Sequence, residues 1–399
     1  MGSTARAVLF TQNGDKLIKR GPKAQVVYLS LKVGRLFGVE VRLHYSWFLI
    51  FVYLTWSLAW GYLPVGYPGQ GDAFYWGVGA FSAAMLFISV LIHEVAHSVV
   101  AQWNNIKVNS ITLYFLGGVS EMTEEVHTSD AELMMAAAGP LISIVIGVAF
   151  YAFFLFGRGF LPIAIVAVLE YTGYINVVLA VFNLIPAFPM DGGRVLRGII
   201  WGRNKDVLKS TRLVTNVSRL ISFLFIALGF LITLFYSDLD GIWLLFIGLF
   251  VQSSAQASMN ETRITQALVG VRVGDIMTRE LKTIEPGLSL QQAQDYAFTP
   301  FKHHGFPVVK DSVLLGIITD EDVRRIKPEH WDDTRVEDVM RKTDDLVKAN
   351  SEDAAVDALI KLSKAGVGRL PVVDEGRLVG IITRGDFTRV IQERLKFRS

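Results

Sequence analysis

Apolar residues dominate the middle of the chain in long runs that are separated by short polar connections. These runs cover residues 46–62, 74–103, 131–156, 162–186, 214–236 and 241–257. A helix needs about 20 residues to cross a hydrocarbon core of about 30 Å, and most of the runs are that long. The pattern predicts a polytopic α-helical membrane protein with about six transmembrane helices.

Polar and charged residues return after the last apolar run. From residue 271 onward, acidic and basic side chains occur throughout, as in a soluble α/β domain. The predicted divisions are a polar, basic lead-in at 1–44, a transmembrane domain at 45–257, a linker at 258–271 and a soluble domain at 272–399. Within the lead-in, alternating stretches at 24–31 and 39–43 predict strands.

The soluble part contains an internal repeat. Residues 305–319 have a counterpart at 369–383, and residues 274–277 have one at 337–340. Each copy is predicted to form a strand, a helix, two strands and a helix. A long period that occurs twice favours two subdomains packed as a pair over a solenoid.

Composition agrees with a membrane protein and excludes several kinds of chemistry. The chain is 51% hydrophobic and 19% charged, with a mean hydropathy of +0.39. The formal net charge of +2 gives no general reason to expect a nucleic-acid partner. The absence of cysteine excludes disulfides, thiolate metal ligands and cysteine nucleophiles.

Basic residues predict the orientation in the membrane. They concentrate in the lead-in and in the connection 187–213, which lie on one side if there are six spans. Basic loops favour the cytosolic side. We therefore expect a multi-pass protein of the cell membrane with cytosolic N- and C-termini. The acidic loop 104–130 would also be cytosolic, which its charge does not support, but acids contribute little to this rule.

The second apolar run contains the motif His93-Glu94-Val95-Ala96-His97. Residues i and i+4 share one helix face, so both imidazoles can reach one ion. Glu94 is then placed to take a proton from a metal-bound water. Ionisable residues inside a membrane are costly and indicate a functional site. A polar cluster between helices, or a proton pathway, is the alternative interpretation.

A second motif, at residues 182–193, follows the fourth apolar run and holds Asn183 and Asp191. Pro186 and Pro189 end the helix there, and Gly192–Gly193 allow a sharp turn. Asp191 can therefore approach a metal from irregular backbone. The alternative is that Asp191 is the N-cap of a helix that begins at Gly193.

Together these motifs resemble the site-2 protease family of intramembrane metalloproteases. Gly117–Gly118 and Ala138-Gly139-Pro140, which would open the third span, strengthen the resemblance, which covers residues 35–257. The resemblance implies that His93, His97 and Asp191 bind one Zn²⁺ and that Glu94 activates water.

The same resemblance implies how a substrate binds. The substrate would be the transmembrane segment of another protein, reached within the membrane lipid. Asn183 would contact the substrate backbone or steady the oxyanion. Residues 108–122 would form a strand pair that receives the unwound substrate by strand addition.

The repeat resembles a tandem CBS domain pair over residues 272–392. The resemblance implies an adenine nucleotide as regulator, with the ribose held by Thr319 and Asp322 in one copy and by Thr383 and Asp386 in the other. Each Thr-x-x-Asp pair could instead only cap the following helix. The resemblance also implies a homodimer through the CBS domains.

The resulting hypothesis is an intramembrane zinc endopeptidase that performs regulated intramembrane proteolysis. Its cytosolic CBS module would sense an adenine nucleotide or mediate dimerisation. Nucleotide binding would gate substrate entry. One alternative is a CBS-regulated transporter or channel, with His93, Glu94 and His97 along a cation path, but it gives the motif around Asp191 no role. A non-catalytic membrane sensor is a third possibility, against which Glu94 argues.

Overall fold

The computed structural model describes residues 30–115, 117–122, 126, 128–236, 240–301 and 303–396. The chain forms two compact units, Met1–Thr262 and Arg263–Ser399.

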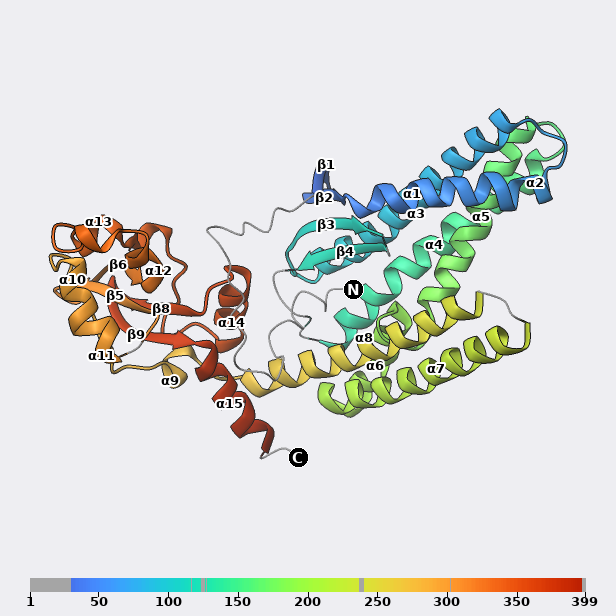
Figure 1. Ribbon diagram of the computed structural model, residues 1–399. Coiled ribbons are helices and arrows are strands. Elements are labelled where there is room, and N and C mark those ends of the chain that lie inside the picture. Colours follow the sequence, from blue (N-terminus) through green and yellow to red (C-terminus); the bar gives the residue numbers. More distant parts are fainter. Residues whose placement is uncertain are drawn as a thin grey trace. The chain divides into compact units, whose positions relative to one another are not determined.

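The first unit is a helical membrane domain, as predicted. Within the described residues, six helical spans are long and apolar enough to cross a membrane. The first span combines α1, η2 and α2, and the other five are single helices (Figure 1). Their bounds are Ser46–Ser57 (α1), Leu58–Tyr62 (η2), Leu63–Gly66 (α2), Asp72–Trp103 (α3), Ser129–Gly157 (α4), Ile163–Asn183 (α5), Val207–Tyr236 (α7) and Asp240–Leu268 (α8).

Helices α7 and α8 extend well beyond the apolar runs that predict them. Helix α7 begins at residue 207 rather than 214, and α8 continues to Leu268 rather than 257. The range 258–271, expected to be a linker, is therefore mostly helical. Several residues there are polar, so the hydropathy pattern ends before the helix does, while Met259, Ala267 and Leu268 are still buried. Likewise, Ala138-Gly139-Pro140 lies inside α4 instead of opening the span.

A four-stranded sheet completes the first unit. Its strands are β1 (Ser30–Leu36), β2 (Val39–His44), β3 (Val108–Tyr114) and β4 (Gly117–Met122), in the order β1-β2-β3-β4. The strand pair at 108–122 and the strand at 39–43 are confirmed. The stretch 24–31 lies mostly outside the described residues, and β1 begins at Ser30.

The sheet joins the lead-in to the membrane domain. Strand β2 pairs in parallel with β3, and β4 is left at one edge. Buried side chains of the sheet, including Val39, Ile111 and Leu113, pack with Ala101 near the end of α3. Residues 30–44 are therefore part of the first unit and not a separate lead-in.

The second unit is an α/β domain in which the predicted repeat is visible. Hairpins β5–β6 and β8–β9 are both antiparallel, with register shifts at the equivalent positions Val308/Val309 and Val372/Val373. The sheet order is β5-β6-β9-β8, with β7 paired to β6. The elements are α9 (Val273–Ile276), α10 (Leu290–Ala293), η3 (Gln294–Phe298), α11 (Thr299–Phe301), β5 (Gly305–Lys310), β6 (Val313–Thr319), α12 (Asp320–Arg324), η4 (Pro328–His330), α13 (Val336–Val339), β7 (Arg341–Lys342), η5 (Thr343–Asp345), α14 (Ala355–Lys364), β8 (Arg369–Asp374), β9 (Arg377–Thr383) and α15 (Arg384–Lys396).

The two copies of the repeat are interlocked. Thr278 of the first copy bridges to Ile381 of the second, and Arg341 of the second pairs with Ile317 of the first. The beginning of each copy thus extends the hairpin of the other, and the copies form one folded module.

Candidate metal centre

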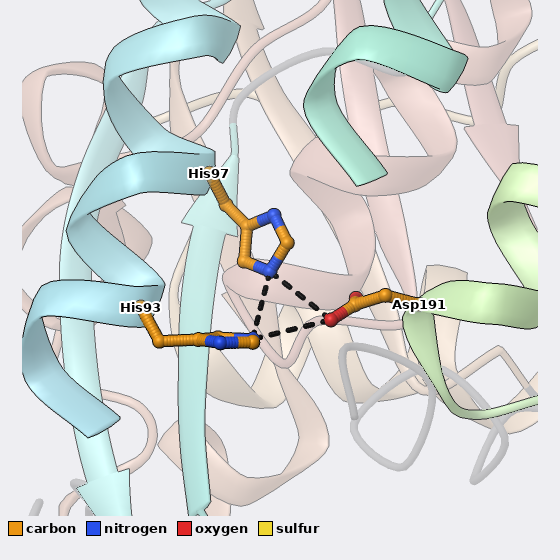
Figure 2. A group of neighbouring side chains, drawn as sticks. All are labelled: His93, His97 and Asp191. Atoms are coloured by element: carbon orange, nitrogen blue, oxygen red, sulfur yellow. Dashed lines mark hydrogen bonds and ion pairs between the residues drawn. The ribbon is translucent and has the colours of Figure 1, made fainter. Parts of the chain in front are cut away.

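Helix α3 presents the two histidines of the motif side by side. One helical turn separates His93 from His97, and their Nε2 atoms lie 3.1 Å apart (Figure 2). The ring planes are nearly perpendicular, with centroids 4.8 Å apart. His93 is 4% exposed. The helical spacing therefore brings both imidazoles to one buried point, as predicted.

The third group of the site is Asp191, the first residue of α6 (Asp191–Asn204). Its Oδ2 lies 3.2 Å from the Nε2 of His93 and 3.2 Å from that of His97 (Figure 2). The N-cap of α6 is Met190, and it makes no side-chain cap hydrogen bond. The interpretation of Asp191 as the N-cap of a helix from Gly193 is therefore wrong: the helix starts earlier, and the carboxylate turns to the imidazoles.

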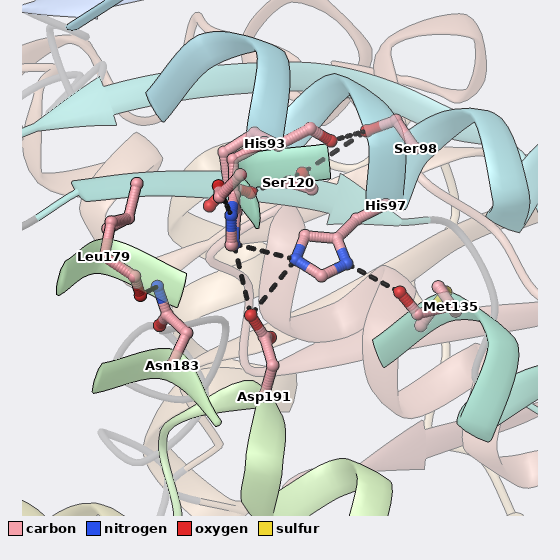
Figure 3. Close-up of polar contacts among 10 residues, drawn as sticks. His93, His97, Ser98, Ser120, Met135, Leu179, Asn183 and Asp191 are labelled. Atoms are coloured by element: carbon pink, nitrogen blue, oxygen red, sulfur yellow. Dashed lines mark hydrogen bonds and ion pairs between the residues drawn. The ribbon is translucent and has the colours of Figure 1, made fainter. Parts of the chain in front are cut away.

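The far nitrogen of each imidazole is held by α4. His97 Nδ1 lies 2.6 Å from the carbonyl oxygen of Met135 (Figure 3). His93 Nδ1 lies 3.0 Å from Ser143 Oγ. A carbonyl only accepts, so His97 Nδ1 carries the hydrogen and donates it. This tautomer leaves the lone pair of Nε2 free for a metal, which is the usual arrangement of a ligating histidine.

The geometry of these three groups fits a zinc ion. Metal–ligand bonds of about 2.0–2.2 Å at tetrahedral angles require ligand atoms about 3.3–3.5 Å apart. The observed separations of 3.1–3.2 Å are close to this edge length. Two imidazoles and one carboxylate, with a fourth position open, form a donor set typical of catalytic zinc.

Gly139 of α4 keeps space beside the three groups. A Cβ atom on this residue would lie 2.3 Å from His97 Nε2 and 2.5 Å from His93 Nε2. Any side chain at this position would therefore occupy the place where the ligand atoms converge.

Glu94 lies against the edge strand of the sheet. Its Oε2 accepts a hydrogen bond of 3.2 Å from Ser120 Oγ on β4, and Ser120 also meets Ser98 Oγ at 3.4 Å. A Cβ on Gly118 of β4 would lie 2.3 Å from Glu94 Cγ. The glycine allows β4 to approach the carboxylate closely, so the predicted base and the strand edge are adjacent.

Asn183 is the last residue of α5, and its side-chain amide nitrogen donates to the Leu179 carbonyl at 3.0 Å (Figure 3). Its role toward substrate stays a prediction.

The Thr-x-x-Asp pairs of the second unit act as helix caps. Thr319 is the N-cap of α12 and forms a reciprocal capping box with Asp322. Thr383 donates its backbone N–H and its hydroxyl to Asp386 Oδ2 at 2.9 and 2.7 Å. Both carboxylates are buried. The capping interpretation is confirmed, and the nucleotide interpretation stays a prediction.

Some residues of the site were missed from the sequence. Ser143 and Met135 orient the histidines, and Ser120 holds Glu94. The sequence contains only a weak indication of Ser143, which lies one turn after Gly139 and therefore on the same face of α4. Nothing in the sequence distinguishes Met135, whose contribution is a backbone carbonyl.

Comparison with known proteins places the chain in a family. The model of peptidase family M50 matches residues 81–162 and 159–228, and the CBS domain model matches 273–329 and 336–393. Rip3 of Mycobacterium tuberculosis is 31% identical over 91% of this chain and 93% of its own length. The zinc metalloprotease MJ0392 of Methanocaldococcus jannaschii is 29% identical over 91% and 96%.

Among solved structures, a site-2 protease from Methanocaldococcus jannaschii is 30% identical and covers 58% of this chain and 95% of that one, with a TM-score of 0.40. The full-length sequence likeness decides the class: the chain belongs to peptidase family M50, the site-2 protease family of membrane metalloproteases. It is a multi-pass member with a tandem CBS domain pair after the membrane spans.

Proposed function

We propose that this protein is an intramembrane zinc endopeptidase that cuts other membrane proteins within or near their transmembrane segments. The convergence of His93 Nε2, His97 Nε2 and Asp191 Oδ2 at 3.1–3.2 Å, directly beside Glu94, carries the proposal. Under the transporter alternative, Asp191 and the loop before it would have no reason to close on the histidines.

Each residue of the site has a separate role in hydrolysis. Zinc held by His93, His97 and Asp191 would supply a Lewis acid for the scissile carbonyl and for water. Glu94 takes the proton from the attacking water and passes it to the leaving amine. Ser120 orients the Glu94 carboxylate by donating to Oε2. Asn183 offers its amide to the substrate backbone or to the oxyanion.

Strand β4 is the proposed docking edge for substrate. A helical substrate shields its carbonyls in its own hydrogen bonds, so it must be extended before it can be cut. An edge strand has unpaired N–H and C=O groups that can bind an extended segment. Because β4 touches Glu94 through Gly118 and Ser120, a segment added to it would lie near the base.

The proposed orientation places both termini in the cytosol. The connection 187–213 carries six basic residues and lies on the same side as the N-terminus in a six-span protein. The metal centre would then lie in the cytosolic half of the membrane, since Asp191 follows the end of α5.

Removal of zinc tests the proposal. We expect the full chain in detergent to bind one zinc and to cut a single-span model protein within its span. Chelation should abolish cleavage, and added zinc should restore it. A protein that binds zinc but cuts no member of a broad substrate panel would contradict an enzyme. Ion flux through reconstituted protein would support the transporter instead.

The CBS pair is proposed to sense an adenine nucleotide. Asp386 Oδ2 is used by Thr383, while Oδ1 accepts from Arg389 Nη2 at 3.1 Å, so a ribose hydroxyl would have to share these partners. A dimerising scaffold is the alternative.

Nucleotide titration of the full chain is expected to raise its melting temperature and to change the cleavage rate. Thr383→Ala removes the hydroxyl and should weaken nucleotide binding about tenfold, since a lost hydrogen bond to a buried partner costs about 1–2 kcal/mol. Cleavage without nucleotide should not change. If nucleotide binds and the cleavage rate stays constant across the titration, the module does not gate the protease.

A further inference from the structure

A buried ion pair joins α4 to α6 beside the metal centre. Glu132 of α4 is 1% exposed, and Arg197 of α6 donates from Nε to Glu132 Oε1 at 2.6 Å. The Nη2 of Arg197 donates to the same oxygen. Glu132 Oε2 has no partner among the residues the structure describes. The guanidinium of Arg197 therefore compensates the negative charge of the buried Glu132 carboxylate.

The α4 side of the pair belongs to the helix face that holds the histidines. Met135 follows Glu132 by three residues, and Gly139 and Ser143 follow at further intervals of four, so all four residues share one face. On this face, the Met135 carbonyl accepts from His97 Nδ1 and Ser143 Oγ contacts His93 Nδ1. Gly139 leaves space for the ligand atoms. The position of α4 therefore decides where the imidazoles lie.

The α6 side of the pair belongs to the helix that begins with Asp191. Arg197 follows Asp191 by less than two turns. Next to it, a Cβ on Gly198 would lie 3.2 Å from both Cβ and N of Leu133, so the two helices approach closely at the ion pair. The contact fixes α6 against α4 at this point.

Arg197 also contacts the loop that leads into Asp191. Its guanidinium carbon lies 5.4 Å from the centre of the Phe188 ring, within the range of a cation–π contact. The backbone N–H of Phe188 donates to Ser218 Oγ on α7 at 2.9 Å. Arg197 thus contacts both Glu132 on α4 and the loop that leads to Asp191, the third proposed ligand.

We infer that Glu132 and Arg197 are positioning residues that set the distance from the Asp191 carboxylate to the two imidazoles, and so tune the zinc affinity. This rests on the proposed function, in which His93, His97 and Asp191 bind zinc. Neither residue is itself one of the three proposed ligands. Groups that orient metal ligands typically change metal affinity by about 10–100-fold when they are lost.

The test compares zinc affinity with fold stability in the full chain, by chelator competition and thermal unfolding of the metal-free form. Arg197→Gln should weaken zinc binding at least tenfold, and Arg197→Lys, which keeps the charge but loses the planar fork, should give a smaller loss. Excess zinc should restore most of kcat without changing KM. Arg219→Gln is the matched control, since Arg219 is exposed and donates from Nη2 to Gln256 Oε1 of α8 at 2.7 Å.

A double variant separates positioning from stability. In Glu132→Gln/Arg197→Gln no charge is left buried without its partner, so the melting temperature should recover. Zinc affinity should stay weak, because the fork that ties α6 to α4 is gone. If the double variant recovered both its melting temperature and its zinc affinity, the inference would be overturned. Unchanged zinc affinity in the folded single variants Arg197→Lys and Glu132→Gln would overturn it as well. A wild type that binds no zinc would instead overturn the proposed function.

Discussion

Glu94→Gln is expected to reduce cleavage by about 10³-fold or more while zinc stays bound. General base catalysis contributes about 10²–10⁴-fold, and an amide cannot take the proton from the attacking water. Glutamine has nearly the same shape, and its carbonyl oxygen can still accept from Ser120 Oγ, as Glu94 does now at 3.2 Å. Because His93, His97 and Asp191 are untouched, the metal content should remain equal to that of the wild type. Cleavage of a single-span substrate and zinc content are measured on the same samples.

A second intramembrane carboxylate provides the control. Glu170 of α5 accepts a hydrogen bond from Tyr67 and lies about 9 Å along the helix before Asn176, which donates to Ser89 Oγ of α3. Glu94 lies about 8 Å beyond Ser89 in the same direction, since the second and fourth spans run parallel. Glu170→Gln makes the same chemical change far from the proposed base and should leave the rate within about threefold. If Glu94→Gln retains zinc and cuts at the wild-type rate, another group is the base.

The parts of this protein that the sequence predicts are those with local causes. Six spans follow from runs of apolar residues, and the convergence of the first two proposed zinc ligands follows from a spacing of one helical turn. The CBS repeat was visible because both copies preserve the same residues in register. None of these predictions requires knowledge of which helix packs against which.

The parts that could not be predicted depend on contacts between distant segments. Asp191 before Gly192 and Gly193 has the local pattern of a helix cap, and only the approach of α3 shows why its carboxylate turns to the histidines. Glu132 and Arg197 are 65 residues apart. In the sequence, Arg197 is one of several basic residues that predict orientation, because a charge pattern cannot reveal a buried partner.

Strand β2 is a further example of a long-range effect. The alternation at 39–43 predicted a strand, but its parallel partner β3 comes after two membrane spans. Local alternation indicates that a strand exists and gives no information about its neighbour. The lead-in was therefore separated from a domain to which it contributes two strands.

Gly139→Ala is expected to weaken zinc binding by about 100-fold or more. The added Cβ would lie 2.3 Å from His97 Nε2 and 2.5 Å from His93 Nε2, distances that real Cβ atoms do not tolerate. The imidazoles cannot move away freely, because Met135 and Ser143 on α4 hold their Nδ1 atoms. Loss of outer partners alone costs about 10–100-fold in metal affinity, and a methyl group at the ligand atoms should cost at least as much. Cleavage should fall in parallel, and chelator competition measures the affinity.

The same substitution should not unfold the domain, and this makes the result interpretable. Alanine favours a helix over glycine by about 1 kcal/mol, which offsets part of the cost of displacing the imidazoles, and thermal unfolding of the metal-free variant checks that it folds. Gly77→Ala on α3 is the matched control, since a Cβ there would meet nothing within 4 Å. We expect Gly77→Ala to bind zinc and cut like the wild type. Wild-type zinc affinity in Gly139→Ala would mean that the imidazoles converge elsewhere when zinc is bound. Selective loss of zinc in a folded variant would mean that the space kept by this one glycine is part of the metal centre.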